Sequence, residues 1–168
     1  MTDARMPRFA GILPYAQDAV GNLYLLLAKE FYGRDKGAWS GFAGRVEARD
    51  KDALAVAARE GFEESSGLLG SEEDLLRILP EQAHAVQCSG GMHFLYPVQY
   101  VPHLPVMFNG VRDALCRVYG NVRYSALLEK DEIRWFTADE LTGDDPALRL
   151  RSCFATDVDR ILLVIRAT

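Results

Sequence analysis

Three glutamates follow an arginine in one short stretch, Arg59 to Glu64, which reads Arg-Glu-Gly-Phe-Glu-Glu. If this stretch is helical, Glu60, Glu63 and Glu64 share one face, because residues three and four apart lie about 5–6 Å from each other at Cβ. Three carboxylates so close repel one another unless water or a hard cation lies among them. Mg²⁺ prefers oxygen ligands and often completes its shell with waters and substrate phosphates. The stretch therefore indicates a divalent-cation site, with an acidic surface helix as the alternative.

The flanking residues predict a helix between a glycine-rich turn at 39–47 and a helix end at 65–68. Asp52 is a suitable N-cap for a helix over 53–65, because its carboxylate can accept from free N–H groups of the first turn. Gly61 costs about 1 kcal/mol relative to alanine inside a helix, which indicates a close approach of this helix to a sheet. We expect the buried side of the helix to lie opposite the glutamates and to consist of Leu54, Ala58, Gly61 and Phe62.

The stretch from Gly44 to Leu68 resembles the Nudix box, the signature of the Nudix hydrolase family. That signature is a glycine, five residues, a glutamate, seven residues, and then Arg-Glu-apolar-any-Glu-Glu-any-Gly-apolar. Gly44 takes the place of the first glycine, and Asp50 stands for the first glutamate. The core of the signature is matched by Arg59, Glu60, Glu63 and Glu64.

The chain departs from the signature at three places. One extra residue lies before Arg59, in a predicted loop where an insertion costs little. Gly61 replaces an aliphatic residue, and Ser66 takes the place of the final glycine, with Gly67 one position later. These departures leave the spacing of the glutamates intact.

The resemblance implies a fold and an activity. The fold is an α/β three-layer αβα sandwich with a mixed sheet, formed here by a single domain over residues 1–168. The activity is hydrolysis of a pyrophosphate bond in a nucleoside diphosphate linked to another group, with Mg²⁺ or Mn²⁺ as cofactor. The alternative is a catalytically inactive Nudix-fold module that binds a nucleotide or has a regulatory role.

The resemblance also implies roles for individual residues. Arg59, Glu60, Glu63 and Glu64 form the catalytic set, with Arg59 orienting a glutamate through a charge-assisted pair. The principal metal ligands are Glu63 and Glu64, Glu60 is a ligand or the base, and a backbone carbonyl of Ala43 or Gly44 completes the shell. Candidates for a further acid are Glu129, Asp131 and Glu132, each of which is equally well explained as a solvated turn residue. Substrate-binding residues are not assigned, although phosphates could be bound by Arg112, Arg117 and Arg123.

The remaining elements follow from apolar patterning and turn residues. A continuous apolar run at 23–29 predicts a central strand that is covered on both faces. Residues 105–128 read as a helical insertion relative to a minimal Nudix domain, and Thr137 as the cap of a short helix. Other strands are predicted at 9–15, 39–42, 92–101 and 133–136, a strand, turn and strand at 75–86, and helices at 109–119, 138–141 and 152–165.

Composition limits the classes of partner. The net charge of −5 over 168 residues disfavours a large basic nucleic-acid surface, although a capped RNA end remains a candidate substrate beside small nucleotides. Three scattered cysteines indicate neither a disulfide framework nor a zinc site and suit the cytoplasm. We expect no signal peptide and no membrane span, because no apolar run approaches about 18 residues. A homodimer is compatible with the insertion helix and with a strand edge near Pro97.

Overall fold

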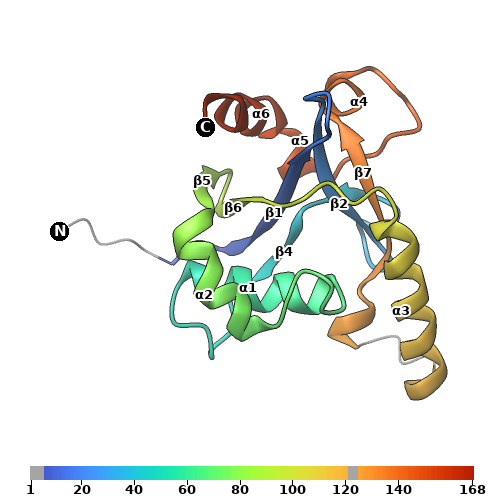
Figure 1. Ribbon diagram of the computed structural model, residues 1–168. Helices are drawn as coiled ribbons and strands as arrows, with labels where there is room; N and C mark the ends of the chain where they lie inside the picture. The colour runs from blue at the N-terminus through green and yellow to red at the C-terminus, as the bar shows by residue number, and fades with distance from the viewer. Residues whose placement is uncertain (1–5, 121–124) are drawn as a thin grey trace.

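The computed structural model describes residues 6–120 and 125–168 of the chain (Figure 1). Its strands are β1 (Phe9–Gln17), β2 (Leu23–Glu30), β3 (Trp39–Ser40), β4 (Phe42–Arg45), β5 (His84–Cys88), β6 (Gly91–Pro97) and β7 (Lys130–Thr137). Its helices are α1 (Ala53–Glu64), α2 (Glu72–Gln82), α3 (Leu104–Tyr119), α4 (Ala138–Thr142), α5 (Ser152–Ala155) and α6 (Val158–Ala167), with a short 3₁₀ turn at Ala126–Leu128.

The strands form one mixed sheet within the described residues. β1 pairs in parallel with β6 and antiparallel with β2 and β4, and the outer strands β3, β5 and β7 pair antiparallel with their neighbours. The register sets Ala10 opposite Gly44 and Gly11 opposite Ala43. It also sets Glu30, the last residue of β2, opposite Lys130, the first residue of β7, beyond an irregularity in the ladder.

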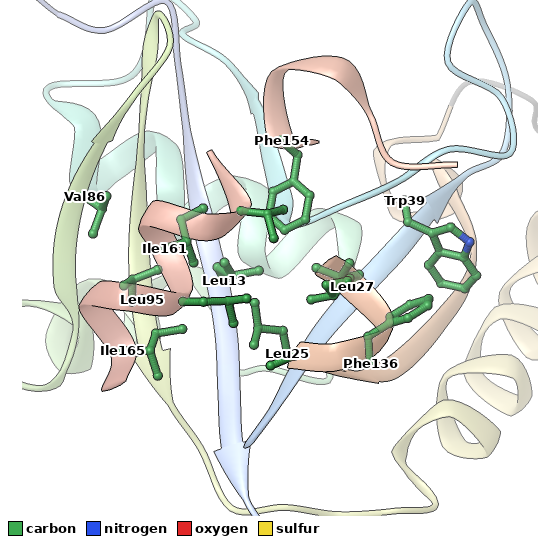
Figure 2. Close-up of a cluster of buried hydrophobic side chains, with 14 of the residues drawn as sticks. Leu13, Leu25, Leu27, Trp39, Val86, Leu95, Phe136, Phe154, Ile161 and Ile165 are labelled. Carbon is green, nitrogen blue, oxygen red and sulfur yellow. The ribbon is translucent and has the colours of Figure 1, made fainter. Parts of the chain in front are cut away.

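Each face of the sheet is covered by helices, which gives the predicted αβα sandwich. Alternate residues of β2 belong to two separate cores: Leu25 and Leu27 pack on one side, and Leu26 and Ala28 on the other. β2 is thus buried on both faces, as its apolar run predicts. The first core is closed by α5 and α6, as Figure 2 shows for Phe154, Ile161 and Ile165. The second core is closed by α1, α2 and α3.

The prediction of a strand at the start of 75–86 is wrong, because this segment belongs to helix α2. Ser71 caps that helix by accepting a hydrogen bond from the Asp74 N–H at 3.1 Å. Leu75 and Leu79, four residues apart, are both fully buried, which is the helical period. Pro80 lies in the last turn of α2, where the helix is about to end. The strand predicted after it is present as β5.

Two further boundaries differ from expectation. β6 ends at Pro97 rather than continuing to residue 101, because proline has no N–H to donate to the ladder. The C-terminal helix is divided into α5 and α6, and Asp157 at the break accepts a hydrogen bond from the Ser89 N–H at 2.9 Å. The apolar stripe predicted for it is nevertheless buried, at Phe154, Val158, Ile161, Leu162 and Ile165.

Helix α3 begins at Leu104, five residues earlier than predicted, and its Phe108 is fully buried in the second core. Residues 121–124 of the predicted insertion, including Arg123, lie outside the described residues. Among the helices that the structure describes, none has the length and apolar character needed to cross a bilayer.

Candidate active site

Helix α1 packs closely against β1 and β4. Its N-cap is Asp52, as predicted, whose carboxylate accepts from the Ala55 N–H at 2.8 Å. Gly61 faces the sheet without a side chain, and a Cβ built there would lie 2.5 Å from Cδ1 of Ile12 on β1. The glycine therefore permits the close approach that the sequence indicates.

The glutamates are not on the solvated side of α1, so the predicted division of this helix into an apolar and an acidic face is wrong. Glu60 is 6% exposed and Glu64 is 3% exposed, whereas Leu54 and Phe62 are only partly buried. Burying carboxylates is costly unless they are paired and hydrogen-bonded. Each of them is accordingly held by a protein cation, a backbone N–H, or both.

Arg59 is the centre of the first charge cluster and is 1% exposed. Its guanidinium donates to Glu60 Oε1 at 2.6 Å and to Glu63 Oε2 at 3.1 Å. It also donates to both carboxylate oxygens of Asp50, at 3.1 and 3.0 Å, and to the Arg45 carbonyl at 2.9 Å. Arg59 thus joins the helix glutamates to the loop before α1, which is the contact expected of a residue that orients a glutamate.

Glu60 lies against the backbone of β4. A Cβ built on Gly44 would fall 2.1 Å from Glu60 Oε1, so the carboxylate occupies space that any side chain at residue 44 would need. Burial raises the pKa of Glu60 to about 7, although the contact with Arg59 opposes the rise. A carboxyl group with a pKa near neutrality can either hold or accept a proton at physiological pH.

Glu63 is the most accessible of the three glutamates, with a side chain that is 18% exposed. Its Oε1 accepts from Nη2 of Arg49 at 2.8 Å, and Arg49 also pairs with Glu47 at 3.1 Å. Glu63 is therefore placed between two arginines, Arg59 from its own helix and Arg49 from the preceding loop.

Glu64 belongs to a second charge cluster. Its Oε2 accepts the Ala43 N–H at 2.8 Å, and its Oε1 lies 3.0 Å from Nζ of Lys130. The same ammonium pairs closely with Glu30 Oε1. Burial raises the pKa of Glu64 and is opposed by Lys130. Burial by itself would lower the pKa of Lys130, but Glu64 and Glu30 outweigh it and raise that pKa, so the lysine stays charged.

Lys130 is a residue of the candidate site that the sequence pattern does not reveal. Its side chain is fully buried, although lysine is almost never fully buried unless it is paired. The local signal is its position as the single cation among Glu129, Asp131 and Glu132, in a segment that the sequence predicts to be an acidic turn. That segment in fact begins β7 and carries Lys130 into the interior.

The candidates for a further acid are placed differently from one another. Glu129 accepts a hydrogen bond from the Tyr32 hydroxyl at 2.9 Å, and its charge contributes to the raised pKa of Glu60. Glu132 pairs closely with Lys29, whose ammonium lies over the Trp39 ring on the sheet face away from α1. The structure thus brings Glu129 toward the carboxylates of α1 and places Glu132 apart from them.

Two of the three arginines proposed for phosphate binding are described. Arg112 donates to the Lys130 carbonyl at 2.9 Å and lies over the Phe31 ring, so it supports the start of β7. Arg117 lies on the exposed part of the last turn of α3.

A cavity of about 290 Å³ lies on the other side of β4, between the sheet and α5. Ala43 and Gly44, which contact Glu64 and Glu60, also line this cavity. Its other lining residues include three arginines, two phenylalanines and a histidine: Arg8, Arg45, Arg151, Phe9, Phe154 and His93. Positive side chains beside aromatic rings suit a small anionic ligand with a flat apolar part.

The donor set of α1 fits a hard divalent cation in its chemistry, because carboxylate oxygens are the ligands that Mg²⁺ prefers. The residues that would hold such an ion are Glu60, Glu63 and Glu64. As they stand, however, Arg59 and Lys130 engage these carboxylates. Within residues 6–120 and 125–168, no three side chains of His, Cys, Asp or Glu converge in an arrangement ready for a metal.

No protein-family model and no curated protein matches the chain. Solved structures match it nearly from end to end. RenU, a Nudix hydrolase from M. smegmatis, matches 97% of this chain and 87% of its own, with a TM-score of 0.53 and 16% identity. The NUDIX domain of Shewanella oneidensis NrtR, complexed with ADP ribose, matches 95% of this chain and 88% of its own length, with a TM-score of 0.57 and 9% identity. A NUDIX hydrolase from Alicyclobacillus acidocaldarius matches 99% of this chain and 97% of its own length, with a TM-score of 0.53 and 15% identity. The chain has the Nudix fold.

Proposed function

We propose that this chain is a Nudix hydrolase, which uses Mg²⁺ or Mn²⁺ to cleave a pyrophosphate bond in a nucleoside diphosphate linked to another group. One observation carries the proposal. The carboxylates of Glu60 and Glu64 lie against Gly44 and Ala43, and these two residues also line the arginine-bearing cavity. A ligand in the cavity and a cation held by the glutamates would therefore both lie next to Ala43 and Gly44 of β4.

The residues of the site have different roles in the proposed reaction. A bound divalent cation supplies charge neutralisation at the phosphates and a lowered pKa of attacking water. Glu63 and Glu64 would be its principal ligands, with the Ala43 carbonyl as a further ligand. Arg59 would fix the orientation of Glu60 and Glu63 through its hydrogen bonds of 2.6 and 3.1 Å to them. Glu60 is a third ligand of the cation or the base; as the base it would not bind the cation, and burial, which raises its pKa to about 7, would let its carboxylate accept a proton near neutral pH.

The cavity is the candidate substrate pocket. Its arginines would bind phosphate oxygens by charge-assisted hydrogen bonds, and Phe9 or Phe154 would contact the base or sugar. Candidate substrates are a nucleoside triphosphate, a nucleotide sugar, a dinucleoside polyphosphate and a capped RNA end. ADP ribose joins the panel because a protein with the same fold, the NrtR domain, was solved with it.

A second candidate function is a nucleotide-binding or regulatory module without turnover. A specific observation favours it: Arg59 and Lys130 already neutralise the carboxylates that a catalytic metal would need. In a pure binding module these ion pairs would be permanent, and the arginine-lined cavity alone would hold the nucleotide.

The test is a hydrolysis screen over the candidate substrates with and without Mg²⁺ or Mn²⁺. We expect metal-dependent release of a phosphorylated product by the natural chain, and its loss in Glu64→Gln and Glu63→Gln. Glu73→Gln is the matched control, since Glu73 is an exposed glutamate on α2. Nucleotide binding without hydrolysis of any panel member would favour the binding module instead.

A further inference from the structure

Lys130 joins three elements of the fold at one buried point. Its ammonium contacts Glu64 at the end of α1 and Glu30 at the end of β2. Glu30 is also approached by Arg151, whose Nη1 lies 3.4 Å from the same Oε1. Both oxygens of Glu64 are in use, one by Lys130 and the other by the Ala43 N–H. Glu64 is therefore fully engaged by the protein.

This arrangement has a consequence for any divalent cation that binds Glu64. Mg²⁺ lies about 2.0–2.1 Å from its oxygen ligands. Because Nζ of Lys130 lies 3.0 Å from Oε1, a cation bound to that oxygen would be within about 5 Å of the ammonium. Two positive charges at that range repel strongly in a site that water hardly screens. Lys130 and a divalent cation thus compete for one carboxylate.

We propose that the ammonium of Lys130 is a resident cation of this site, which weakens divalent-cation binding at Glu64. The inference rests on the proposed function only in taking Glu64 as a metal ligand. The ammonium would neutralise Glu64 and Glu30 whenever no metal is bound, which keeps two buried carboxylates paired. Metal binding would then require Glu64 to turn away from Lys130.

The test measures Mn²⁺ binding to the full chain by electron paramagnetic resonance of free Mn²⁺, without any nucleotide. Lys130→Met removes the charge and keeps a similar length, and Lys130→Gln removes the charge but keeps a hydrogen-bond donor. We expect at least tenfold tighter Mn²⁺ binding, or one additional bound ion, in both variants. Adding Glu64→Gln to either variant should return binding to the level of the natural chain.

Lys29→Met is the matched control, because Lys29 on β2 pairs with Glu132 and contacts neither Glu64 nor Glu30 in the described residues. It should leave Mn²⁺ binding unchanged. Unchanged Mn²⁺ affinity and stoichiometry in Lys130→Met and Lys130→Gln would overturn the inference. If either variant is unstable without metal, thermal unfolding decides: a larger Mn²⁺-induced rise in Tm than in the natural chain supports the inference, and an equal rise overturns it.

The two proposals can fail separately. Tighter Mn²⁺ binding by the Lys130 variants, with no hydrolysis by the natural chain, would keep the resident cation and reject the hydrolase. Metal-dependent hydrolysis by the natural chain, with unchanged Mn²⁺ binding in the variants, would keep the hydrolase and reject the resident cation.

Discussion

The carboxylate of Glu60 lies directly over the backbone of Gly44, at a place where even one methyl group would come within 2.1 Å of Oε1. This relationship gives a physical reason for glycine at residue 44, where the stretch that resembles the Nudix box begins. The glycine is needed because the space that a side chain would fill already holds a buried carboxylate, which Arg59 fixes in turn.

We predict that Gly44→Ala displaces the Glu60 carboxylate and lowers hydrolysis by about 100-fold, since a misplacement of about 1 Å in a catalytic group can cost that much. The fold should survive, because the displaced atoms are the end of a side chain and not backbone. Steady-state kinetics on the substrate found by the screen measure the loss of hydrolysis, and circular dichroism checks that the variant is folded. Gly110→Ala, at an exposed position with no atom within 4 Å, is the control and should keep full activity. Full activity in Gly44→Ala would contradict this role for the glycine.

Arg59→Ala should destabilise the protein by about 3–5 kcal/mol, because it leaves buried Asp50 and Glu60 without their counter-charge. Arg59→Lys should recover only part of this loss, since lysine keeps the charge but not the planar set of five donors. Urea unfolding measures the free energy of unfolding in each variant. Arg77→Ala, with a side chain that is 72% exposed, should change it by no more than about 0.5 kcal/mol. A loss as small in Arg59→Ala would show that the cluster is not stabilising.

The spacing of Glu60, Glu63 and Glu64 predicts a helix with three clustered carboxylates, because helical neighbours are set by local geometry. The fold is predicted from the resemblance of the longer stretch from Gly44 to Leu68 to the Nudix box. The contacts of Arg59 follow for the same reason, since its nearest partners lie on the same helix or in the loop just before it. Helix α2 could also have been predicted from the sequence, because the pattern Ser-Glu-Glu-Asp before Leu75 is typical of a helix N-terminus. The apolar residues that follow were interpreted as a strand instead.

Lys130 could not be placed in the same way. Its burial depends on β7 pairing with β2, whose residues are about a hundred positions away, so no local pattern reports it. The cavity is a similar case, because it is lined by residues from separate segments that include Arg8, Ser89 and Cys153. Both features come from long-range assembly, and both bear directly on the chemistry of the site.

Gly61→Ala should destabilise the protein despite the better helix propensity of alanine. The added Cβ would lie 2.5 Å from Cδ1 of Ile12, which is fully buried. Overpacking of this kind costs about 1–3 kcal/mol, and over most of this range the cost is larger than the gain of about 1 kcal/mol in helix propensity. Ile12→Val removes the atom that clashes, so the double variant should be more stable than the sum of the two single losses predicts. The double-mutant cycle compares the free energies of unfolding in urea of the natural chain, the two single variants and the double variant. Strictly additive losses would show that the contact with Ile12 does not cause the destabilisation by Gly61→Ala.

His93 is buried between the rings of Phe9 and Phe154, at centroid distances of 5.8 and 6.1 Å. Burial lowers the pKa of His93 from 6.5 to about 4, and the charge of Asp157 only partly opposes it. The unfolded chain therefore binds this proton more readily than the folded one. The stability that neutral His93 contributes is complete above about pH 6.5 and is lost as the pH falls toward 4, by roughly 3 kcal/mol.

His93→Phe should remove this part of the pH dependence, because phenylalanine fills the site without a titrating nitrogen. The measurement is the free energy of unfolding in urea at pH 7, 5.5 and 4, taken as the difference between the natural chain and the variant so that the carboxylates cancel. The difference should shift in favour of the variant as the pH falls. His84→Phe, at an exposed histidine on β5, should show no such shift. A difference for His93→Phe that stays constant from pH 7 to 4 would mean that the buried ring titrates no differently in the folded and unfolded states.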